Sequence, residues 1–586
     1  MTSPDHSSLA EQKLSKGQEW ALFLVAILPI AVIVRLISEY AVNVPYGDEW
    51  SLLPLFAKWH DHQLTFADLF RQHNEHRIFF PKLIYLTCAR WTHWNVRSEM
   101  FFSVLLCCVT SAGIYFLIQR TIAATPRKRL LLWALINLLI FAPVQAENWL
   151  WGFQLQVFLP TLCLVGSLAL LSSALPELAK VLGASLLAVV ATFSFGGGLL
   201  LWPAIAFYLL CKGEGLSWLI CWIAAFVLIT FIYFTGYTGH PIPGPQFGNP
   251  LDYFAYFVEF IGIALSRSSL TTGAAITAGT IGAMAFLLYL IGWWLFLKSP
   301  REMRVAAAPW LALGAYAILS AALSAYMRVS NGPQQALNSR YASISLNLYI
   351  ALVGLVAVAA QSLRARQGPA RFAKLVVSGE APFFTAVVTL SALSFPAAID
   401  HMEILHSVRL EGLARLQFCK IIGPSEKLRN ALLIGTPLPM IMQDVDLADR
   451  LQLVNPTIRH SAALLDAEDR PQRSTPEFGR CESLIPKEAA LEVRGWSFLP
   501  RRGRPGPCAV LAYESAGNWV AFALSDIRES RADIVKEMKS RRYSDSGWRR
   551  VIHRNELPEG AARISAWALD PAAGEVYKLP GDFIAP

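Results

Sequence analysis

The chain has 586 residues and a mean hydropathy of +0.41, and 54% of its residues are hydrophobic while only 16% are charged. This composition is far more apolar than that of a soluble domain and indicates a membrane protein. The formal net charge of +9 is weak support for nucleic-acid binding. Basic residues of a multispanning protein gather in its cytoplasmic loops, and the sequence shows no nucleic-acid motif.

Apolar runs near the ~20 residues that cross a bilayer recur from Trp20 to about Ile399. The first run, Trp20–Tyr40, is longer than the core of a signal peptide and lacks a small-residue cleavage site, so we expect a retained anchor and a chain that begins near Met1. The pattern predicts eleven spanning helices, at 20–40, 98–119, 130–146, 153–174, 181–196, 198–211, 216–236, 271–297, 306–326, 341–361 and 381–399.

With residues 1–19 in the cytoplasm, most loop lysines and arginines fall on one side, as the positive-inside rule expects. The segment Ile78–Trp94 is apolar enough for a twelfth span, but that span would put the basic cluster 127–129 outside. We therefore expect an interfacial helix there. This topology predicts a multi-pass protein of the bacterial inner membrane, with the tail and four loops outside: 43–77, 144–152, 237–258 and 327–340.

The sequence turns polar after about Asp400. Residues 401–470 are predicted to form a helical connector, with an apolar stripe of Ile404, Leu405, Val408, Leu413 and Leu416. After a linker at 469–476, alternating segments predict a small β-sandwich over 477–586. These segments are ALEVRGWSFL, CAVLAYES, NWVAFALSD, ARISAWALD and EVYKL. The predicted fold class is a polytopic α-helical membrane domain over 20–400 with an extracytoplasmic tail that ends in a β-sandwich.

Three of the nine cysteines, Cys419, Cys481 and Cys508, lie in the polar tail. A disulfide between Cys481 and Cys508 requires an exported tail, and three cysteines leave one over.

Asp48 and Glu49 follow Gly47 directly after the first predicted span. One interpretation is an acidic helix start, with Asp48 as N-cap of an amphipathic helix that carries Trp50 and Phe56. The other is a carboxylate that takes a proton from an acceptor or holds a metal ion at the membrane surface. Charge and capping favour the first interpretation, and the next motif along the chain favours the second.

That motif is His73-Asn74-Glu75-His76-Arg77. His73 and His76 are three residues apart, a spacing that places both on one helical face and suits a pair of metal ligands. The spacing matches no zinc signature, so a metal site and a polar binding loop both remain open. No motif requires a cofactor. A divalent metal ion, held by Asp48, His73 and His76, is the one candidate.

Two further external segments are rich in polar groups. Glu147–Gln156 contains Glu147, Asn148, Gln154 and Gln156 among tryptophans, which suits either an aromatic belt or a substrate site. Met327–Tyr341 contains Arg328 and Arg340, which are costly near a membrane unless they are paired or bind an anion. A phosphate suits the planar guanidinium, while a snorkelling arginine is the alternative. Arg267 is a weaker candidate of the same kind.

Together, YGDEW, HNEHR and NSRY in this topology resemble the GT-C-type glycosyltransferases, and the resemblance covers about residues 20–400. That superfamily has roughly eleven to thirteen spans, an acidic motif in the first external loop and a polyprenyl-phosphate-linked sugar as donor. The resemblance implies a hexosyl- or pentosyltransferase whose acceptor is a glycan, a lipid or a protein. The chain has no strict Asp-x-Asp, so the metal dependence of some relatives does not carry over.

By the same resemblance, Asp48 is the general base and Glu49 its neighbour or a metal contact. Arg340, with Arg328, holds the leaving lipid phosphate. His73, Glu75 and His76 complete the acceptor or metal site, and Arg77, Glu147, Asn148 and Gln154 contact substrate. Two other classes stay open. A transporter or lipid-linked sugar flippase would place its charges near the midplane in paired repeats, which the sequence lacks. A non-catalytic anchor for the β-domain would leave the loop carboxylates without a role.

The tail resembles a small β-domain that accompanies some bacterial glycan-processing proteins. Trp496 and Trp548 would stack on sugar rings there, although buried core tryptophans are the favoured interpretation, and Arg531 and Asp533 would order a turn.

Overall fold

A computed structural model describes residues 15–213, 215–238, 249–266, 271–365, 370–464, 478–488, 490–525, 527–559 and 563–584, without the side chains of 362–377 and 527. Arg267, the linker 469–476 and residues 239–248 of the loop 237–258 lie outside the described residues. The chain divides into two compact units. The first contains Met1–Ala41, Thr65–Thr87 and Arg97–Glu403, and the second contains Val42–Leu64, Cys88–Val96 and Ile404–Pro586.

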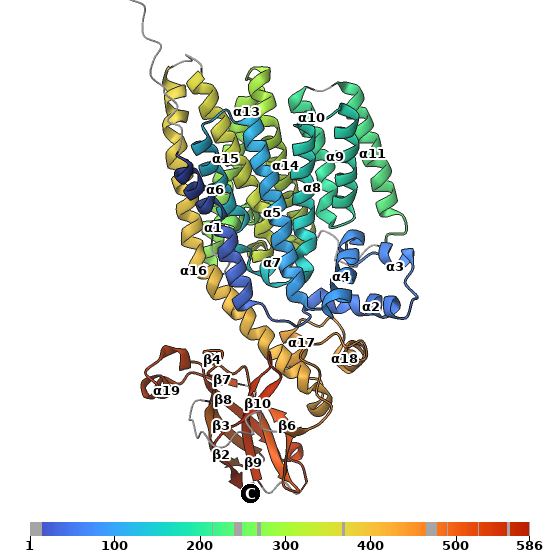
Figure 1. The fold of residues 1–586 in the computed structure, drawn as a ribbon, viewed down its shortest axis with the longest axis vertical. Coiled ribbons are helices and arrows are strands. Elements are labelled where there is room, and N and C mark those ends of the chain that lie inside the picture. Colours follow the sequence, from blue (N-terminus) through green and yellow to red (C-terminus); the bar gives the residue numbers. More distant parts are fainter. Residues whose placement is uncertain are drawn as a thin grey trace, which may run out of the picture. The chain divides into compact units, whose positions relative to one another are not determined.

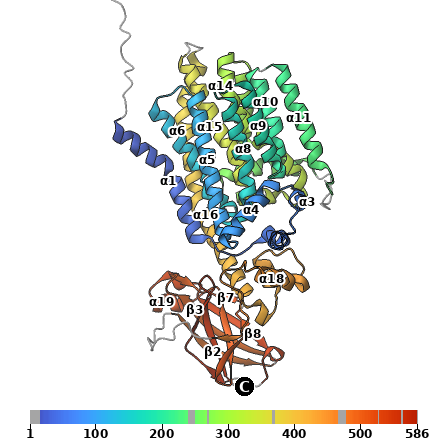
Figure 2. The ribbon, with the colours of Figure 1, turned by 45° about the vertical axis from the view of Figure 1, so that its right-hand side comes forward.

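The first unit is a bundle of helices that run side by side (Figures 1 and 2). Its long helices are α1 (Lys16–Tyr40), α5 (Val96–Thr121), α6 (Pro126–Ile140), α8 (Leu155–Leu171), α9 (Glu177–Thr192), α10 (Leu201–Lys212), α11 (Leu216–Phe234), α13 (Thr272–Leu297), α14 (Arg301–Arg328), α15 (Ala342–Ala365) and the first part of α16 (Ala370–Ile422). Each of the eleven predicted spans coincides with one of them.

Nine helices of the described chain are long and apolar enough to cross a membrane, and α9 and α10 are the two shorter members. Their surfaces fit this assignment. Ile220, Val227 and Phe231 of α11 are each more than half exposed. A contiguous exposed apolar surface of this kind is typical of a helix that faces lipid. The prediction of a polytopic helical membrane protein is confirmed.

The segment Ile78–Trp94 forms the short helix α4 (Phe79–Thr92). This 14-residue helix is not among the helices of the described chain that are long and apolar enough to cross a membrane, and the interfacial placement stays a prediction. Lys82 is buried and donates to the carbonyls of Asp68, Leu69 and Arg71 at 3.1, 3.1 and 2.7 Å. These carbonyls end helix α3 (Phe66–Phe70), so the lysine serves as its cap, and burial lowers the pKa of Lys82 to about 8.

The loops of the bundle fall into two sets because successive helices run in opposite directions. At one end the Lys212 ammonium donates to the Leu171 carbonyl at 3.4 Å, and the Ala123 N–H donates to Gln361 Oε1 at 2.8 Å. The loops with HNEHR, Glu147 and Arg328 lie at the other end of their helices. The predicted site residues of the first unit therefore share one end of the bundle.

Helix α16 runs without a break through 53 residues, so the predicted span 381–399 and the predicted connector helix are one helix. The predicted apolar stripe is wrong in part. Leu413 and Leu416 are buried, but Ile404 is 60% exposed and Val408 39% exposed. The buried side of this part instead includes Arg409, Ala414 and Phe418, because Ala414 and Phe418 pack on the β-domain core.

The tail forms a two-sheet sandwich, as predicted. One sheet has the order β1-β6-β5-β9-β10, with β11 beside β9, and the other has the order β2-β3-β8-β7, with β4 beside β3. The strands are β1 (Ala463–Leu464), β2 (Gly479–Lys487), β3 (Ala490–Leu499), β4 (Arg504–Pro505), β5 (Ala509–Ser515), β6 (Asn518–Leu524), β7 (Ile527–Glu529), β8 (Gly547–His553), β9 (Arg563–Asp570), β10 (Glu575–Lys578) and β11 (Phe583–Ile584). All described pairs are antiparallel, and the five predicted segments are β3, β5, β6, β9 and β10.

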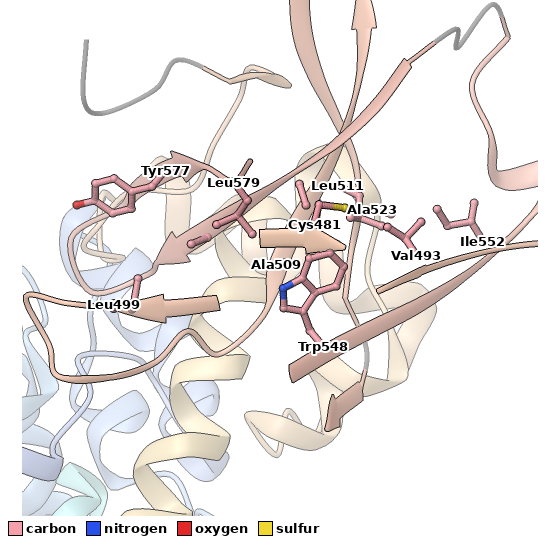
Figure 3. Packing of buried hydrophobic residues seen from close by; sticks show 12 residues of the cluster. Cys481, Val493, Leu499, Ala509, Leu511, Ala523, Trp548, Ile552, Tyr577 and Leu579 are labelled. Carbon is pink, nitrogen blue, oxygen red and sulfur yellow. The ribbon is translucent and has the colours of Figure 1, made fainter. Parts of the chain in front are cut away.

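The sandwich core explains its tryptophans. Trp548 is 2% exposed and packs among Val493, Leu511 and Ile552 (Figure 3), and Trp496 is 5% exposed. Neither indole can stack on a sugar in this fold, so the favoured interpretation of core tryptophans is confirmed. Cys481 and Cys508 are buried free thiols in two different apolar clusters. The disulfide that an exported tail would allow between them is not formed in this structure.

Arg531 and Asp533 order a turn, as predicted. The Arg531 guanidinium donates to the Asp533 carboxylate at 2.9 and 2.6 Å, and to both oxygens of Glu482 at 2.8 Å. Arg531 is also the N-cap residue of α19 (Ala532–Glu537). The ion pairs therefore join the start of this helix to strand β2.

Candidate active site

The motif HNEHR forms a tight turn between α3 and α4. The backbones of His73 and His76 pair through two hydrogen bonds of 2.7 and 2.8 Å, and Asn74 takes a φ of +46° in the turn. The turn is held against the end of α11 by Gln72, whose amide exchanges hydrogen bonds of 2.9 and 3.1 Å with Thr238. The predicted helical face for the two histidines is wrong, since this backbone pairing replaces a helix.

Glu75 joins the turn to helix α14. Its carboxylate accepts a hydrogen bond from the guanidinium of Arg328, the last residue of that helix. The Glu75 carbonyl accepts from the Tyr237 hydroxyl at 3.1 Å. Two predicted site residues that lie 253 positions apart are therefore brought together.

His76 is held in a largely apolar setting. Its ring lies 4.6 Å from the ring of Phe195, and a Cβ added to Gly196 would lie 2.5 Å from His76 Nδ1. Nδ1 is buried and has no hydrogen-bond partner. Burial lowers the pKa of His76 to about 4, although the negative charge of Glu75 acts in the opposite sense. The imidazole is neutral at pH 7, and the glycine-rich turn at 196–198 leaves room for it.

This pKa predicts an acid-sensitive stability. Between pH 6.5 and about 4 the unfolded chain protonates His76 while the folded chain does not, so the free energy of unfolding falls as pH is lowered through that window and levels off below it. His76→Asn removes this contribution. We expect the melting temperature of the wild type to fall more steeply from pH 7 to pH 4 than that of the variant. Parallel melting curves would contradict the assignment.

Arg77 is bound to the backbone, contrary to the prediction that it contacts substrate. It is 3% exposed, and its guanidinium donates to the carbonyls of Phe70, Tyr233 and Thr235 at 2.7, 2.6 and 2.6 Å. It also lies over the Phe70 ring, 4.5 Å from the centroid. The last carbonyls of α11 have no partner within the helix, and Arg77 supplies one.

Arg77→Met is therefore expected to destabilise the protein by about 3 kcal/mol or more, because several buried carbonyls lose their donor. Thermal unfolding in detergent measures the loss. A variant with wild-type stability but impaired donor or acceptor binding would instead restore the substrate-contact role.

A second cluster lies where α15 begins. The Glu147 carboxylate accepts from the Ser339 hydroxyl at 2.9 Å and from the Arg340 N–H at 3.1 Å. Asn148 is fully buried, and its Nδ2 donates to the Arg340 carbonyl at 2.8 Å and to the Ser343 hydroxyl at 2.6 Å. These bonds engage both the backbone N–H and the backbone carbonyl of Arg340, so Glu147 and Asn148 position this residue.

The Arg340 guanidinium lies 5.4 Å from the centroid of the Tyr341 ring and makes no salt bridge with a carboxylate among the described residues. Burial raises the pKa of Tyr256 well above its usual value, and Tyr341 raises it further by a smaller amount. The positive charges of Arg328 and Arg340 act in the opposite direction and lower this pKa. Both predicted phosphate arginines are thus close enough to act on one tyrosine, on helix α12 (Pro250–Gly262).

Two residues near this cluster were not predicted from the sequence. Tyr256 donates to Gln335 Oε1 at 3.4 Å. Glu259, one turn further along α12, is 8% exposed, and burial raises its pKa to about 7. A lone acid within the apolar run YFVEFIG was the available signal. Gln154 and Gln156 are 6% and 5% exposed, and Gln156 Oε1 has no hydrogen-bond partner.

Asp48 and Glu49 belong to the second unit, in the 3₁₀ helix η1 (Gly47–Leu52), which leads into α2 (Leu53–His60). Glu49 is fully buried, and its carboxylate accepts the Tyr46 N–H at 2.8 Å, so Tyr46 and Glu49 form the cap that was predicted for Asp48. Asp48 is half-buried, and its carbonyl accepts from Ser51 Oγ at 2.6 Å. The amphipathic interpretation also holds, since Trp50, Leu53 and Phe56 are buried.

The arrangement of His73, Glu75 and His76 does not fit a metal site. Glu75 is bound by Arg328, and Nδ1 of His76 is closed off against Gly196. No group of three or more histidine, cysteine, aspartate or glutamate residues that could hold a metal ion occurs within the described ranges. The alternative set of Asp48, His73 and His76 draws on both units and stays a prediction.

No protein-family model matches the sequence, and no curated protein matches it. Among solved structures, the chain is similar to the archaeal oligosaccharyltransferase AglB from Archaeoglobus fulgidus, which was solved in complex with an inhibitory peptide and a dolichol-phosphate. The likeness covers 72% of this chain and 61% of that chain, with 14% sequence identity and a TM-score of 0.42. The chain thus spans about three fifths of that protein's length.

Proposed function

We propose that the protein is a membrane glycosyltransferase that moves a sugar from a polyprenyl-phosphate-linked donor to a glycan, lipid or protein acceptor. The proposed location is the external face of the bacterial inner membrane. The observation that carries this proposal is the setting of Arg340. Hydrogen bonds hold its backbone, and its guanidinium, on which the nearby Glu147 charge acts, forms no salt bridge with a carboxylate in the described chain. A fixed guanidinium at a helix start is suited to a phosphate.

The proposed reaction is a displacement at the anomeric carbon. The acceptor oxygen or nitrogen forms the new bond to this carbon, the bond to the phosphate oxygen breaks, and polyprenyl phosphate leaves with the electron pair. Arg340 stabilises the negative charge that grows on the leaving phosphate. Arg328 contributes less, because Glu75 balances its charge.

Asp48 is the proposed general base that takes the proton of the acceptor. Glu49 is assigned a supporting role, since its carboxylate is buried and engaged by the Tyr46 N–H. The roles of Asp48 and Arg340 rest on the setting of each within its own unit. His73, Glu75 and Gln154 remain proposed acceptor or sugar contacts, and Glu147 and Asn148 act through Arg340.

The test is turnover of radiolabelled polyprenyl-phosphate hexoses and pentoses by the purified protein in lipid nanodiscs, with and without a chelator. Sugar release or transfer by the wild type supports the proposal, and turnover that survives the chelator supports a metal-free site. Tight donor binding without turnover across all donors would contradict it and would favour a flippase or transporter.

A further inference from the structure

The acidic loop and the polar tail belong to the same compact unit, although they lie far apart in the sequence. The Asn43 side chain donates to the Asn455 carbonyl at 3.1 Å, across 412 residues. Its other atom, Oδ1, accepts the Val96 N–H at 3.1 Å. Asn43, which precedes the acidic motif Asp48-Glu49, therefore links the loop that carries this motif to the tail.

The motif is bonded to the tail directly as well. The Gly47 N–H donates to the carbonyl of Leu432 at 2.8 Å, and Leu432 is fully buried. Gly47 has a φ of +56°, a conformation that glycine adopts without strain. The residue before Asp48 thus makes its backbone hydrogen bond to the segment that follows α17 (Glu426–Ala431).

Arg409 of α16 completes this contact. It is 1% exposed, and its guanidinium carbon lies 4.2 Å from the centroid of the Tyr46 ring. Tyr46 in turn donates its backbone N–H to the Glu49 carboxylate, so the residues on either side of Gly47 and Asp48 are bonded to each other. Burying an arginine costs free energy unless its charge and its planar guanidinium make favourable contacts. Stacking on the Tyr46 ring is one such contact.

We propose that Arg409 is a positioning residue for Asp48, and that residues 404–455 of the tail are the scaffold of the acidic loop rather than an independent appendage. This inference rests on the proposed function for the role of Asp48. Arg409 is buried, and the role proposed for it is indirect. It acts through Tyr46, whose backbone adjoins Gly47 and Asp48. A displacement of about 1 Å in a catalytic group is enough to lower a rate by two orders of magnitude.

The test is Arg409→Lys in the full-length protein in nanodiscs. Lysine keeps the charge but loses the planar stack. We expect hydrogen exchange of the backbone amides at 44–50 to rise at least about tenfold, and kcat to fall by about tenfold or more with the donor KM within about twofold of wild type. Unchanged exchange at 44–50 would overturn the proposal.

Arg415→Lys is the matched control. Arg415 lies on the same helix, but it donates to Glu411 at 3.0 and 2.8 Å and to the Ser525 carbonyl at 3.3 Å. We expect its exchange at 44–50 and its kcat to stay near wild type. Equal losses in both variants would indicate general destabilisation of the tail and would overturn a specific role for Arg409.

Tyr46→Leu guards against a folding artefact, because it removes the stacked ring while leaving Arg409 in place. It should reproduce the exchange pattern of Arg409→Lys, and a wild-type pattern would overturn the proposed path through Tyr46. The exchange measurement does not depend on turnover. If the wild type turns over no donor, the proposed function fails, and the exchange result alone decides whether the tail holds the loop.

Discussion

Asp48→Asn is expected to lower kcat for sugar transfer by about 10²–10⁴-fold, the usual contribution of a general base. Asparagine has nearly the same size but cannot accept the proton of the acceptor. The fold should survive, because the cap of η1 is made by Glu49, whose carboxylate accepts the Tyr46 N–H. Single-turnover transfer in nanodiscs, with a saturating donor, measures the effect on the chemical step.

Glu49→Gln is the matched control for this prediction. The glutamine oxygen can still accept the Tyr46 N–H, so the loop should keep its conformation, and we expect kcat to fall far less than in Asp48→Asn. An equal loss in the two variants would show that the loop was disturbed rather than the base removed. A wild-type kcat for Asp48→Asn would contradict its role outright.

Arg340→Ala is expected to lower kcat/KM for the donor by about 10²–10³-fold, since it removes a donor that meets the charge developing on the leaving phosphate. The bonds from Glu147 and Asn148 go to the backbone N–H and carbonyl of this residue, so alanine leaves them intact. The affinity for free polyprenyl phosphate should fall in parallel. Inhibition of the wild type and the variant by this product measures that affinity.

Arg328→Ala serves as the comparison for Arg340→Ala. The Arg328 charge is balanced by Glu75, so its loss should reduce phosphate affinity less. Arg340→Lys should recover part of the activity, because the charge remains while the bidentate geometry is lost. Wild-type phosphate affinity in Arg340→Ala would remove the main support for the proposed function.

The part of the fold that could be predicted follows from short-range patterns. Hydropathy over ~20 residues predicts each long helix, because the bilayer imposes that length on any apolar segment. Alternation predicted five strands of the sandwich, but the two-residue strands β1, β4 and β11 carry no periodicity. Strands β2, β7 and β8 were missed as well, and β8 (Gly547–His553), with two arginines in seven residues, did not alternate clearly.

The site was predicted less completely, because polarity does not reveal which group a side chain contacts. The sequence marked Arg77, Glu75 and Arg328 alike as polar residues near the membrane surface. In the structure Arg77 holds three backbone carbonyls, whereas Glu75 and Arg328 pair with each other. Glu49 had the same weight as Asp48 in the motif, yet its carboxylate is a buried cap.

The sequence by itself determined that this is a helical membrane protein with a β-sandwich tail and ionisable residues beside its first span. Composition and periodicity are properties of neighbouring residues, and the bilayer and the sheet act on them locally. Only the tertiary structure decided that the acidic loop belongs with the tail and that Arg409 stacks on Tyr46. Such contacts join residues hundreds of positions apart, so local sequence patterns do not identify which residues pack together.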